Sequence, residues 1–466
     1  MAAKLLAMAG LVGALSMLVA AADDATYTAA VYQHTRIKIK GNATATKLAN
    51  VGTYAPAAAA ARQAGADIIV FPEVGIGSNE ISRAENVAFC EDIPDPSANI
   101  TPCLENASYC AARPALCELS CIARRNQLYM VVGMNDIKPC PSNATHCPND
   151  GLLLFNTAVV LDRNGTVVQR YHKKHIFSPF PVFDVPTPAE VKSFTTDFGI
   201  TFGIFICFDS LYPDPPLELY KLGLEHFVFP TSWVNVAPLL TATQMQQSWS
   251  RAFNATLLAS NTGAISTSGS GIYQCGNPLV TYFNASGSDA SDSRLLVAQV
   301  PKQGCRGNNV SPSSFAPQPV PRLAANAVND QVNDQANDQA NDNCGRVGVD
   351  KCSCDLVTMQ PGAKGHLSAT FGNLHCEATY EFAENQTASG ELFGLLVYSG
   401  TEWFIEALPV QYCAFVKCAS PTACAIADVN DNPVLYFSDS WVQSVSISGA
   451  SCTHSPPSYA LTSLQL

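Results

Sequence analysis

The chain has 466 residues, of which 47% are hydrophobic and only 14% are charged. Globular proteins carry about 25% charged residues, so other groups must contribute to hydrating this surface. The 26 Lys and Arg residues against 38 Asp and Glu residues give a net charge of −12. This balance argues against a nucleic-acid-binding protein, which would present a basic surface. The apolar content excludes a disordered chain, and the length indicates about two or three domains.

The N-terminus has the pattern of a secretory signal peptide. Lys4 precedes an apolar run over residues 5–19, and small residues at 20–22 precede two aspartates. A basic start, a short apolar run and an Ala-x-Ala end are typical of a cleaved leader. The run is shorter than the roughly 20 residues that a membrane span needs. We therefore expect removal of residues 1–22 and a secreted, extracellular protein with no membrane span.

Glycans and disulfides are both expected in such a protein. The 18 cysteines favour an oxidising compartment, and sugars on Asn-x-Ser/Thr sequons would help to hydrate a surface poor in charge. The candidate N-glycosylation sites are Asn42, Asn99, Asn106, Asn143, Asn164, Asn284, Asn309 and Asn385. A further sequon begins at Asn254, where a predicted helix favours the unmodified side chain.

A low-complexity segment at residues 312–343 divides the chain. It begins rich in proline and continues as a four-residue repeat of the type Asn-Asp-Gln-Ala. Such a repeat has no apolar face to bury, so it predicts an extended linker. We expect a first domain at 23–311 and a second at 344–466.

Strand and helix patterns alternate through the first domain. An Ala-rich helix is predicted from about Pro56, which suits the first helical turn, to Ala64, where Gly65 suits the stop. Strands are predicted at 67–71, 128–134, 202–207 and 226–229, with a hairpin of 152–162 and 166–171 around Asn164-Gly165 and a helix at 244–260. Apolar strands covered by helices predict an α/β layered domain.

The second domain shows short strands at 392–398, 403–409 and 434–437, separated by glycine, proline and cysteine. This pattern predicts a β-rich module stapled by disulfides. Its cysteines are Cys344, Cys352, Cys354, Cys376, Cys413, Cys418, Cys424 and Cys452. Their even number allows complete pairing, but spacing alone does not give the pairs.

One cysteine of the first domain differs from the others. Those in this domain are Cys90, Cys103, Cys110, Cys117, Cys121, Cys140, Cys147, Cys207, Cys275 and Cys305. Cys207 ends an apolar strand, whereas most others lie in predicted loops. Setting it aside leaves an odd number, so one more cysteine must be free or pair elsewhere.

Cys207 is a candidate nucleophile, which would need a base and an oxyanion donor. His172, His175 and His226 lack the surroundings of the known Cys–His proteases. A carboxylate and a lysine offer another arrangement, because Glu73 follows the strand at 67–71 and Lys173 follows the hairpin. Each residue alone also has a purely structural explanation: the two charged residues as solvated side chains, and the cysteine as a buried thiol.

In these contexts the chain resembles the nitrilase superfamily of carbon–nitrogen hydrolases. The matching motifs are Phe-Pro-Glu at 71–73, Tyr-His-Lys at 171–173 and Cys-Phe-Asp at 207–209. Within the superfamily, segments 170–177, 198–209, 229–235, 257–261 and 269–273 are most similar to the vanin/biotinidase branch. The resemblance implies an αββα sandwich, followed by a smaller disulfide-rich β domain. It also implies a catalytic triad of Glu73, Lys173 and Cys207.

The resemblance departs from the branch at two places. Phe180 stands where the branch often has a glutamate, and segment 90–147 is unusually rich in cysteine. The register of the family motif selects Lys173 over its neighbour Lys174 as the catalytic lysine.

The resemblance also implies roles for these residues. Glu73 would be the general base and Cys207 the nucleophile, while Lys173 and the backbone N–H of Phe208 would stabilise the oxyanion. Lys173 should also favour the thiolate. Trp233 follows the strand at 226–229, on the same strand-end side as Cys207 if the strands run parallel. It would therefore either line the substrate pocket or be an aromatic residue of the core or of the rim. No metal and no cofactor are expected.

The function implied is hydrolysis of a small secondary amide through a cysteine thioester. Pantetheine, split into pantothenate and cysteamine, is the first candidate substrate. The alternatives are biotinidase-like hydrolysis of biotinyl amides and a catalytically inactive secreted glycoprotein on the same fold. The triad cannot separate the two substrates. We expect a monomer whose partner is a small-molecule amide, with no nucleic acid bound.

Overall fold

A computed structural model describes residues 25–77, 82–141, 147–177, 182–235, 241–264, 267–283, 293–305, 353–358, 360–371, 374–382, 384, 392–403, 407–418 and 442–450. The predicted leader 1–22, the predicted linker 312–343, the predicted strand 434–437, Phe180, Asn143, Asn284, Asn309 and Asn385 lie outside the described residues. The chain divides into two compact units, residues 1–235 with 245–310, and residues 236–244 with 311–466.

The first unit contains two six-stranded sheets. In spatial order, the first sheet comprises β12 (Arg294–Pro301), β1 (Thr26–Gln33), β2 (Ile68–Val70), β3 (Tyr129–Pro139), β4 (Leu152–Leu161) and β5 (Val167–His172). The second comprises β11 (Asn277–Tyr282), β10 (Ser270–Gln274), β9 (Thr256–Ser260), β8 (His226–Pro230), β7 (Thr201–Ile204) and β6 (Ser193–Thr195). Strands β1, β2 and β3 run parallel, as do β7, β8 and β9. All other pairs in these sheets are antiparallel.

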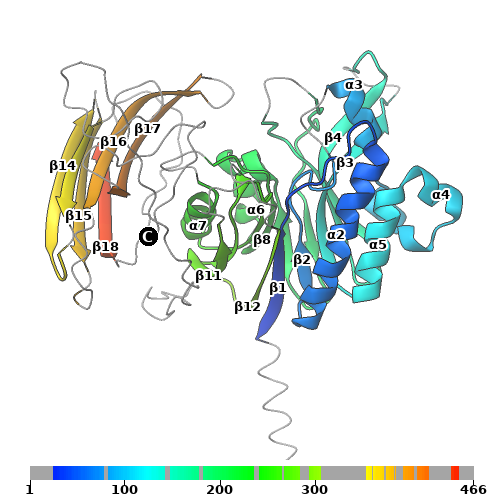
Figure 1. The fold of residues 1–466 in the computed structure, drawn as a ribbon, viewed down its shortest axis with the longest axis horizontal. Helices are drawn as coiled ribbons and strands as arrows, with labels where there is room; N and C mark the ends of the chain where they lie inside the picture. Colours follow the sequence, from blue (N-terminus) through cyan, green and yellow to red (C-terminus); the bar gives the residue numbers. More distant parts are fainter. Residues whose placement is uncertain are drawn as a thin grey trace, which may run out of the picture. The chain divides into compact units, whose positions relative to one another are not determined.

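Helices cover the outer face of each sheet, as Figure 1 shows. Helices α2 (Ala43–Gln63) and α5 (Pro114–Asn126) share a buried core with β2 and β3, while α6 (Pro216–Lys221) and α7 (Ala242–Ala252) lie beside the second sheet. Shorter helices are α3 (Arg83–Asn86), α4 (Ala107–Ala112), η1 (Val87–Phe89), η2 (Pro96–Ala98), η3 (Pro102–Leu104) and η4 (Cys207–Leu211). The predicted αββα sandwich is therefore confirmed.

The prediction that a helix starts near Pro56 is wrong. Helix α2 begins at Ala43, where Asn42 Oδ1 accepts a hydrogen bond from the backbone N–H of Ala45 at 2.9 Å, and Pro56 lies inside it. A proline in a helix interior removes one hydrogen bond. The helix continues through it because residues such as Val51 and Tyr54 are fully buried against the sheet.

Two further boundaries differ from prediction. The predicted helix at 244–260 ends at Ala252, and the buried run Thr256–Ser260 forms strand β9. A short continuous apolar run fits a buried helix or a buried strand equally well, so the sequence pattern could not separate them. Asn254 therefore lies outside the helix, with φ of +45°. Strand β7 ends at Ile204, so Cys207 begins η4 rather than ending a strand.

The second unit is a small β domain, as predicted. One sheet contains β13 (Ser353–Thr358), β16 (Leu392–Trp403) and β17 (Ala407–Cys418); the other contains β14 (Lys364–Phe371), β15 (Leu374–Phe382) and β18 (Val442–Ala450). All pairs are antiparallel. Leu367, Phe382, Phe393 and Phe415 belong to its buried core. The predicted strand at 403–409 is wrong, because Trp403 ends β16 and β17 starts at Ala407.

Five disulfides lie within the described part of the chain. They are Cys103–Cys121, Cys110–Cys117, Cys140–Cys147, Cys275–Cys305 and Cys376–Cys413. Cys90 and Cys207 are buried free thiols. This pairing explains the odd count in the first domain: Cys90 is the second cysteine that remains a thiol.

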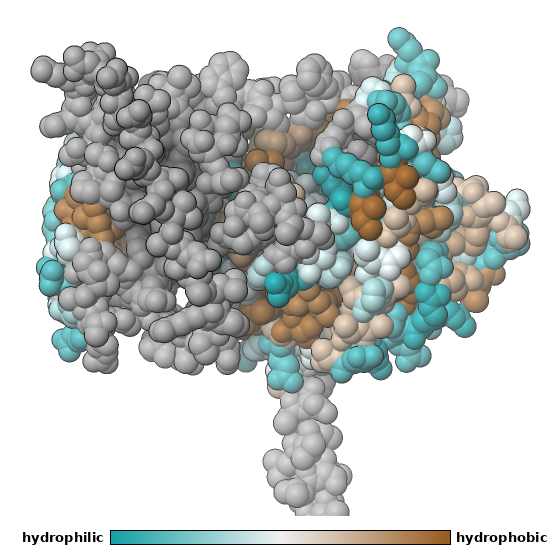
Figure 2. Space-filling model, viewed as in Figure 1, coloured by the Kyte–Doolittle hydropathy of each residue, from teal (hydrophilic) through white to brown (hydrophobic). Residues whose placement is uncertain are grey.

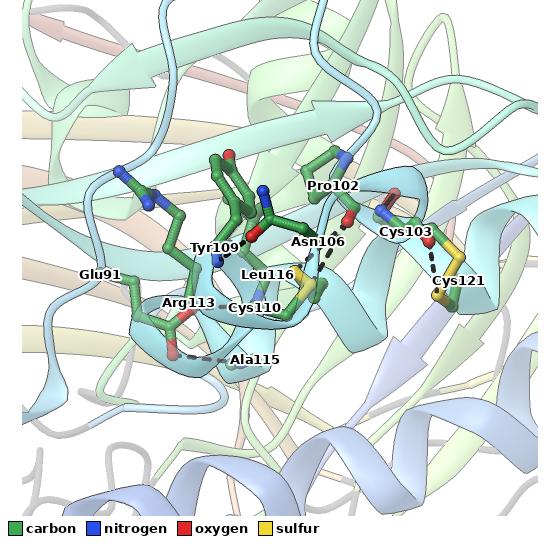
Figure 3. The surroundings of a disulfide bond; sticks show 12 residues. Glu91, Pro102, Cys103, Asn106, Tyr109, Cys110, Arg113, Ala115, Leu116 and Cys121 are labelled. Carbon is green, nitrogen blue, oxygen red and sulfur yellow. Dashed lines mark hydrogen bonds between the residues drawn. A yellow bond between two sulfur atoms is a disulfide. The ribbon is translucent and has the colours of Figure 1, made fainter.

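Two of these disulfides lie close together around α4 and α5, the region drawn in Figure 3. Side chains cap the starts of both helices here: Asn106 Oδ1 accepts from the N–H of Tyr109 at 3.0 Å, and the Glu91 carboxylate accepts from Ala115 at 3.1 Å and Leu116 at 2.9 Å. Disulfides and caps therefore fix this cysteine-rich segment of the chain.

Hydrophilic and hydrophobic residues are interspersed on the face that carries α2 (Figure 2). Four of the candidate sequon asparagines, Asn42, Asn99, Asn106 and Asn164, are exposed. None of the helices within the described ranges combines the length and the apolar content that a membrane crossing needs.

Candidate active site

Glu73, Lys173 and Cys207 lie just beyond the ends of three strands. Glu73 follows β2, Lys173 follows β5 directly, and Cys207 follows β7 of the opposite sheet. Their exposed fractions are 3%, 2% and 5%. Buried groups of this kind are almost always paired, and here the partners are one another.

The Glu73 carboxylate accepts hydrogen bonds at both oxygens. Oε1 accepts from Lys173 Nζ at 2.6 Å and from Asn156 Nδ2 at 2.7 Å, while Oε2 accepts from the backbone N–H of Ser232 at 2.8 Å. The Cys207 thiol lies near enough to this carboxylate to help lower its pKa. The carboxylate is therefore oriented by donors that come from both sheets.

Glu73 and Lys173 form a charged pair in spite of their burial. Burial raises the pKa of Glu73, but the charge and hydrogen bond of Lys173, together with the bonds from Asn156 and Cys207, bring this pKa below its usual value of 4.5. Burial lowers the pKa of Lys173, and the charges of Glu73 and Cys207 raise it above its usual value by more. The site thus holds one carboxylate and one ammonium at neutral pH.

Cys207 is a protonated thiol in this environment. Burial and the nearby Glu73 carboxylate raise its pKa to about 12, although Lys173 acts in the opposite direction. The expectation that Lys173 would favour the thiolate is therefore correct for that one contribution and wrong for the net effect. A protonated thiol needs a base, and Glu73 is placed to accept its proton.

The backbone at Cys207 is in a conformation that few residues adopt. Its φ of +47° lies in the left-handed region, which costs a non-glycine residue about 1–2 kcal/mol. Such strain persists only where the surrounding structure over-determines it, and it is concentrated at functional sites. Here the turn presents the Cys207 side chain to Glu73.

Asp209 joins the turn at Cys207 to the segment that carries Lys173. Its Oδ2 accepts from the Tyr171 hydroxyl at 2.8 Å and from the backbone N–H of Ile206 at 3.0 Å, and its Oδ1 accepts from the N–H of His175 at 2.8 Å. Burial raises its pKa to about 6. The sequence motif contained Asp209, but its linking role was not predicted.

Sequence reasoning also missed Asn156. Besides the bond to Glu73, its backbone carbonyl accepts from the N–H of Lys173 at 2.8 Å. The signal was present in the hairpin around Asn164-Gly165, because pairing of its two strands sets Thr157 opposite His172 and so places Asn156 beside Lys173. The hairpin register would have identified this residue.

The two predicted substrate-binding residues both follow Cys207 in the sequence and differ in burial. Phe208 follows Cys207 and is half-buried, with its ring 5.2 Å from that of Phe177 and 5.3 Å from that of Tyr212. Trp233 is 6% exposed, and its backbone N–H donates to Asn261 Oδ1 at 2.9 Å. Since β7 and β8 run parallel, Cys207 and Trp233 follow the same ends of neighbouring strands.

Comparisons with known proteins agree with this architecture. The family model for carbon–nitrogen hydrolases matches residues 28–270, and that for the vanin C-terminal domain matches residues 352–457. A biotinidase from Takifugu rubripes is 34% identical over 420 residues, which is 86% of this chain and 81% of the relative. A pantetheinase from Homo sapiens is 32% identical over 406 residues, 84% of this chain and 74% of the relative.

Solved structures include an amidase from Nesterenkonia sp., which is 18% identical with a TM-score of 0.43 and covers 61% of this chain and 93% of its own. The assignment depends instead on the sequence matches above. The chain belongs to the carbon–nitrogen hydrolases, enzymes that act on carbon–nitrogen bonds, and within the nitrilase superfamily to the vanin/biotinidase branch.

Proposed function

We propose that this chain is a secreted amidohydrolase that cleaves pantetheine into pantothenate and cysteamine, with Glu73, Lys173 and Cys207 as its catalytic residues. The observation that carries the proposal is the contact of Glu73 Oε1 with Lys173 Nζ at 2.6 Å, with the Cys207 thiol on the same carboxylate. This arrangement supplies a base, a cation and a nucleophile in one buried place, which is what acyl transfer through a thioester requires.

The first half of the reaction forms the thioester. Glu73 accepts the thiol proton as Cys207 sulfur attacks the amide carbonyl carbon, and the carbonyl oxygen becomes an oxyanion. Lys173 Nζ and the backbone N–H of Phe208 donate to that oxygen. The carbon–nitrogen bond then breaks, cysteamine takes the proton from Glu73 and leaves, and the pantothenoyl group stays on Cys207.

The second half releases the acid. Glu73, again a carboxylate, accepts a proton from water while the water oxygen attacks the thioester carbonyl carbon. The second tetrahedral intermediate uses the same two donors. It collapses with cleavage of the carbon–sulfur bond, sulfur recovers its proton from Glu73, and pantothenate leaves. The water supplies the oxygen of the new carboxyl group, and the enzyme returns to its starting protonation state.

Biotinyl amides are the second candidate substrate. The Takifugu rubripes relative at 34% identity is a biotinidase, whereas the Homo sapiens relative at 32% is a pantetheinase. These values are too close to separate the substrates. Both are secondary amides of a small carboxylic acid, so the same triad chemistry serves either.

Mass spectrometry of the protein after brief exposure to substrate tests this proposal. A pantothenoyl adduct on Cys207 together with cysteamine release would support the pantetheine assignment, and Cys207→Ala should show neither. A biotinyl adduct after exposure to biotinyl-lysine, without reaction of pantetheine, would support the alternative. An intact protein that acylates with neither amide would overturn the proposed activity in favour of a non-catalytic glycoprotein.

Secretion and glycosylation are part of the same proposal. The five disulfides fit an extracellular protein. At Asn42 and Asn106 the helix caps use Oδ1 and not Nδ2, the atom that bears a sugar. At Asn254, in contrast, Nδ2 donates to the carbonyl of Cys305 at 2.7 Å. We expect the secreted monomer to begin after residue 22 and to carry sugar at the exposed sequons but not at Asn254. N-terminal sequencing and glycopeptide mapping would check this expectation.

A further inference from the structure

A buried ionic cluster lies behind the proposed active site, and the chemistry above does not use it. Side chains alternate between the two faces of a strand, so Asn156 faces Glu73 while its neighbour Phe155 lies on the reverse face. Asp136 pairs with Phe155 across β3 and β4, and the His172 ring stacks on that of Phe155 at 4.2 Å. The cluster is therefore centred on the residue that precedes Lys173.

His172 contacts a carboxylate at each ring nitrogen. Its Nε2 lies 2.9 Å from Asp136 Oδ2, and its Nδ1 lies 3.0 Å from Glu190 Oε1. Its backbone N–H also donates to Glu190 Oε2 at 3.1 Å, so Glu190 holds both the ring and the main chain. Only the imidazolium form has two N–H donors, and the side chain is 94% removed from solvent. The contacts therefore select a charged histidine.

Other charged groups balance this cluster on every side. Those that bear on His172 and its two carboxylates are Lys138 of β3, Asp92 between η1 and η2, Arg170 of β5, Lys192 near Glu190, and the thiol of Cys90 near Asp136. Burial lowers the pKa of His172, but the hydrogen bonds to Asp136 and Glu190 and their charges raise it above the usual 6.5. The proton on His172 is thus held by its neighbours and is lost only as the pH rises.

We propose that His172 is a positioning residue for Lys173: its imidazolium, held between Asp136 and Glu190, fixes the peptide that sets the Lys173 ammonium against Glu73. The main chain around His172 is held at two successive peptides, because Glu190 accepts from the N–H of His172 and Asn156 accepts from the N–H of Lys173 at 2.8 Å. The inference rests on the proposed function, in which Lys173 must lie beside both the base and the oxyanion.

Deprotonation of the His172 ring would remove one of its two hydrogen bonds to carboxylates. A neutral imidazole has one N–H and one lone pair, so one carboxylate would face a lone pair instead of a donor. The His172–Lys173 peptide would lose one of its supports, and the Lys173 ammonium would move relative to Glu73. Because a displacement of about 1 Å at a catalytic group can reduce the rate on the order of 100-fold, activity should fall at alkaline pH through this group.

The test measures kcat and KM against pH for the wild type, His172→Gln and Glu190→Gln. His172→Gln should lower kcat on the order of 10- to 100-fold with little change in KM, because the side chain does not touch substrate. In the profile of kcat against pH, the alkaline limb is the fall in kcat at high pH. Glu190→Gln should move this limb to lower pH, because removing this carboxylate makes the His172 proton easier to lose. Glu190 is only partly buried, with 22% of its side chain exposed, so this variant should fold even if His172→Gln does not.

His226→Gln is the matched control. His226 is also 5% exposed, and it contacts the Tyr27 hydroxyl and the carbonyl of Lys302 on the other sheet. It should keep the wild-type kcat and alkaline limb. A wild-type kcat in His172→Gln, an unmoved limb in Glu190→Gln, or equal losses in His172→Gln and His226→Gln would each overturn the inference.

Alkylation of Cys207 by iodoacetamide gives a second readout that needs no turnover. Lys173 favours the thiolate of Cys207, so displacing the ammonium in His172→Gln should slow alkylation at a fixed pH below the alkaline limb, where wild-type His172 is still protonated, and an unchanged rate would overturn the inference. A wild type that hydrolyses neither pantetheine nor biotinyl-lysine would overturn the proposed function, while the alkylation rates would still decide the placement of Lys173.

Discussion

The Lys173 ammonium lies 2.6 Å from Glu73 Oε1, and both side chains are almost completely removed from solvent. A buried ion pair of this kind adds little net stability, but removing one partner leaves an uncompensated charge and costs about 3–5 kcal/mol. The pair is thus expected to serve chemistry more than folding, and the two contributions can be separated by mutation.

Lys173→Met should lose stability and activity together. The unpaired Glu73 carboxylate should lower the free energy of unfolding by about 3–5 kcal/mol, and loss of an oxyanion donor should lower kcat at least on the order of 10²–10³-fold. The double variant Glu73→Gln/Lys173→Met removes both charges, so it should recover most of the stability and none of the activity. Urea unfolding and turnover of the three proteins check this. Substantial turnover by a folded Lys173→Met protein would contradict the assigned role.

The acid limit of activity should reflect the depressed pKa of Glu73. Since its pKa in the folded protein lies below the usual 4.5, the base stays ionised and kcat/KM should hold until the pH falls below that value. Stability should depend on pH in the same direction as activity. The contribution of the Glu73 carboxylate to the free energy of unfolding is present above its unfolded-state pKa and is lost as the pH falls through the lower folded-state value. Profiles of kcat/KM and of unfolding free energy against pH measure both.

Asn156→Asp should move this acid limit upward. The substitution replaces a donor to Glu73 Oε1, at 2.7 Å, with a second carboxylate, and a nearby like charge raises the pKa of a carboxyl group. The midpoint of the acid limb should shift to higher pH, whereas Asn106→Asp, on the surface, should leave it unchanged. An acid limb of Asn156→Asp that coincides with the wild type would show that Asn156 does not hold the base in solution.

Glu73→Gln should make the Cys207 thiol easier to ionise and the enzyme slower. The Glu73 charge contributes to raising the pKa of Cys207 to about 12, so its removal should lower this pKa and speed alkylation at a fixed alkaline pH. Turnover should nevertheless fall on the order of 10²–10⁴-fold, the usual contribution of a general base. Both proteins should carry Cys90→Ser as well, so that alkylation of Cys90 does not add to the signal: Cys90 is the other free thiol among the described residues, and burial raises its pKa to about 12. Slower alkylation in Glu73→Gln would contradict this account.

The disulfides should differ in their stabilising effect according to the length of chain they close. Cys275–Cys305 joins residues 30 apart and Cys110–Cys117 joins residues 7 apart. The entropy of loop closure gives about 3.7 and about 2.4 kcal/mol for such bridges. Paired serine substitutions, compared by urea unfolding, should therefore destabilise the protein more at 275 and 305. The reverse order would show that contacts in the folded state, rather than chain entropy, dominate.

The layers of the fold were predictable, but the chemistry of the site was only partly so. Alternating apolar strands and helices predicted the α/β domain, and local turn signals predicted the hairpin of β4 and β5. The family motif pointed to Glu73, Lys173 and Cys207, which the structure places together, while their catalytic roles stay predictions. Sequence could not give the raised pKa of Cys207, because it depends on burial between two sheets.

The other features that sequence reasoning missed also depend on contacts between distant parts of the chain. The bond from Ser232 to Glu73 and the clamp of Glu190 on His172 join segments that are distant in the chain. No local pattern encodes them, since they exist only once the strands have paired in register. Helix α2 passes through Pro56 for a similar reason, because tertiary burial outweighs a local preference.

Strand β12 is the last strand that the structure describes in the first unit, and it pairs antiparallel with β1, the first, from Thr26↔Pro301 to Gln33↔Arg294. During synthesis, the edge of β1 that pairs with β12 therefore stays unpaired until almost the whole unit has been translated. An open edge invites pairing with other chains. Any shortened version of this enzyme must consequently extend through Cys305, which also closes the bridge to Cys275, or it will expose the strand with which the sheet begins.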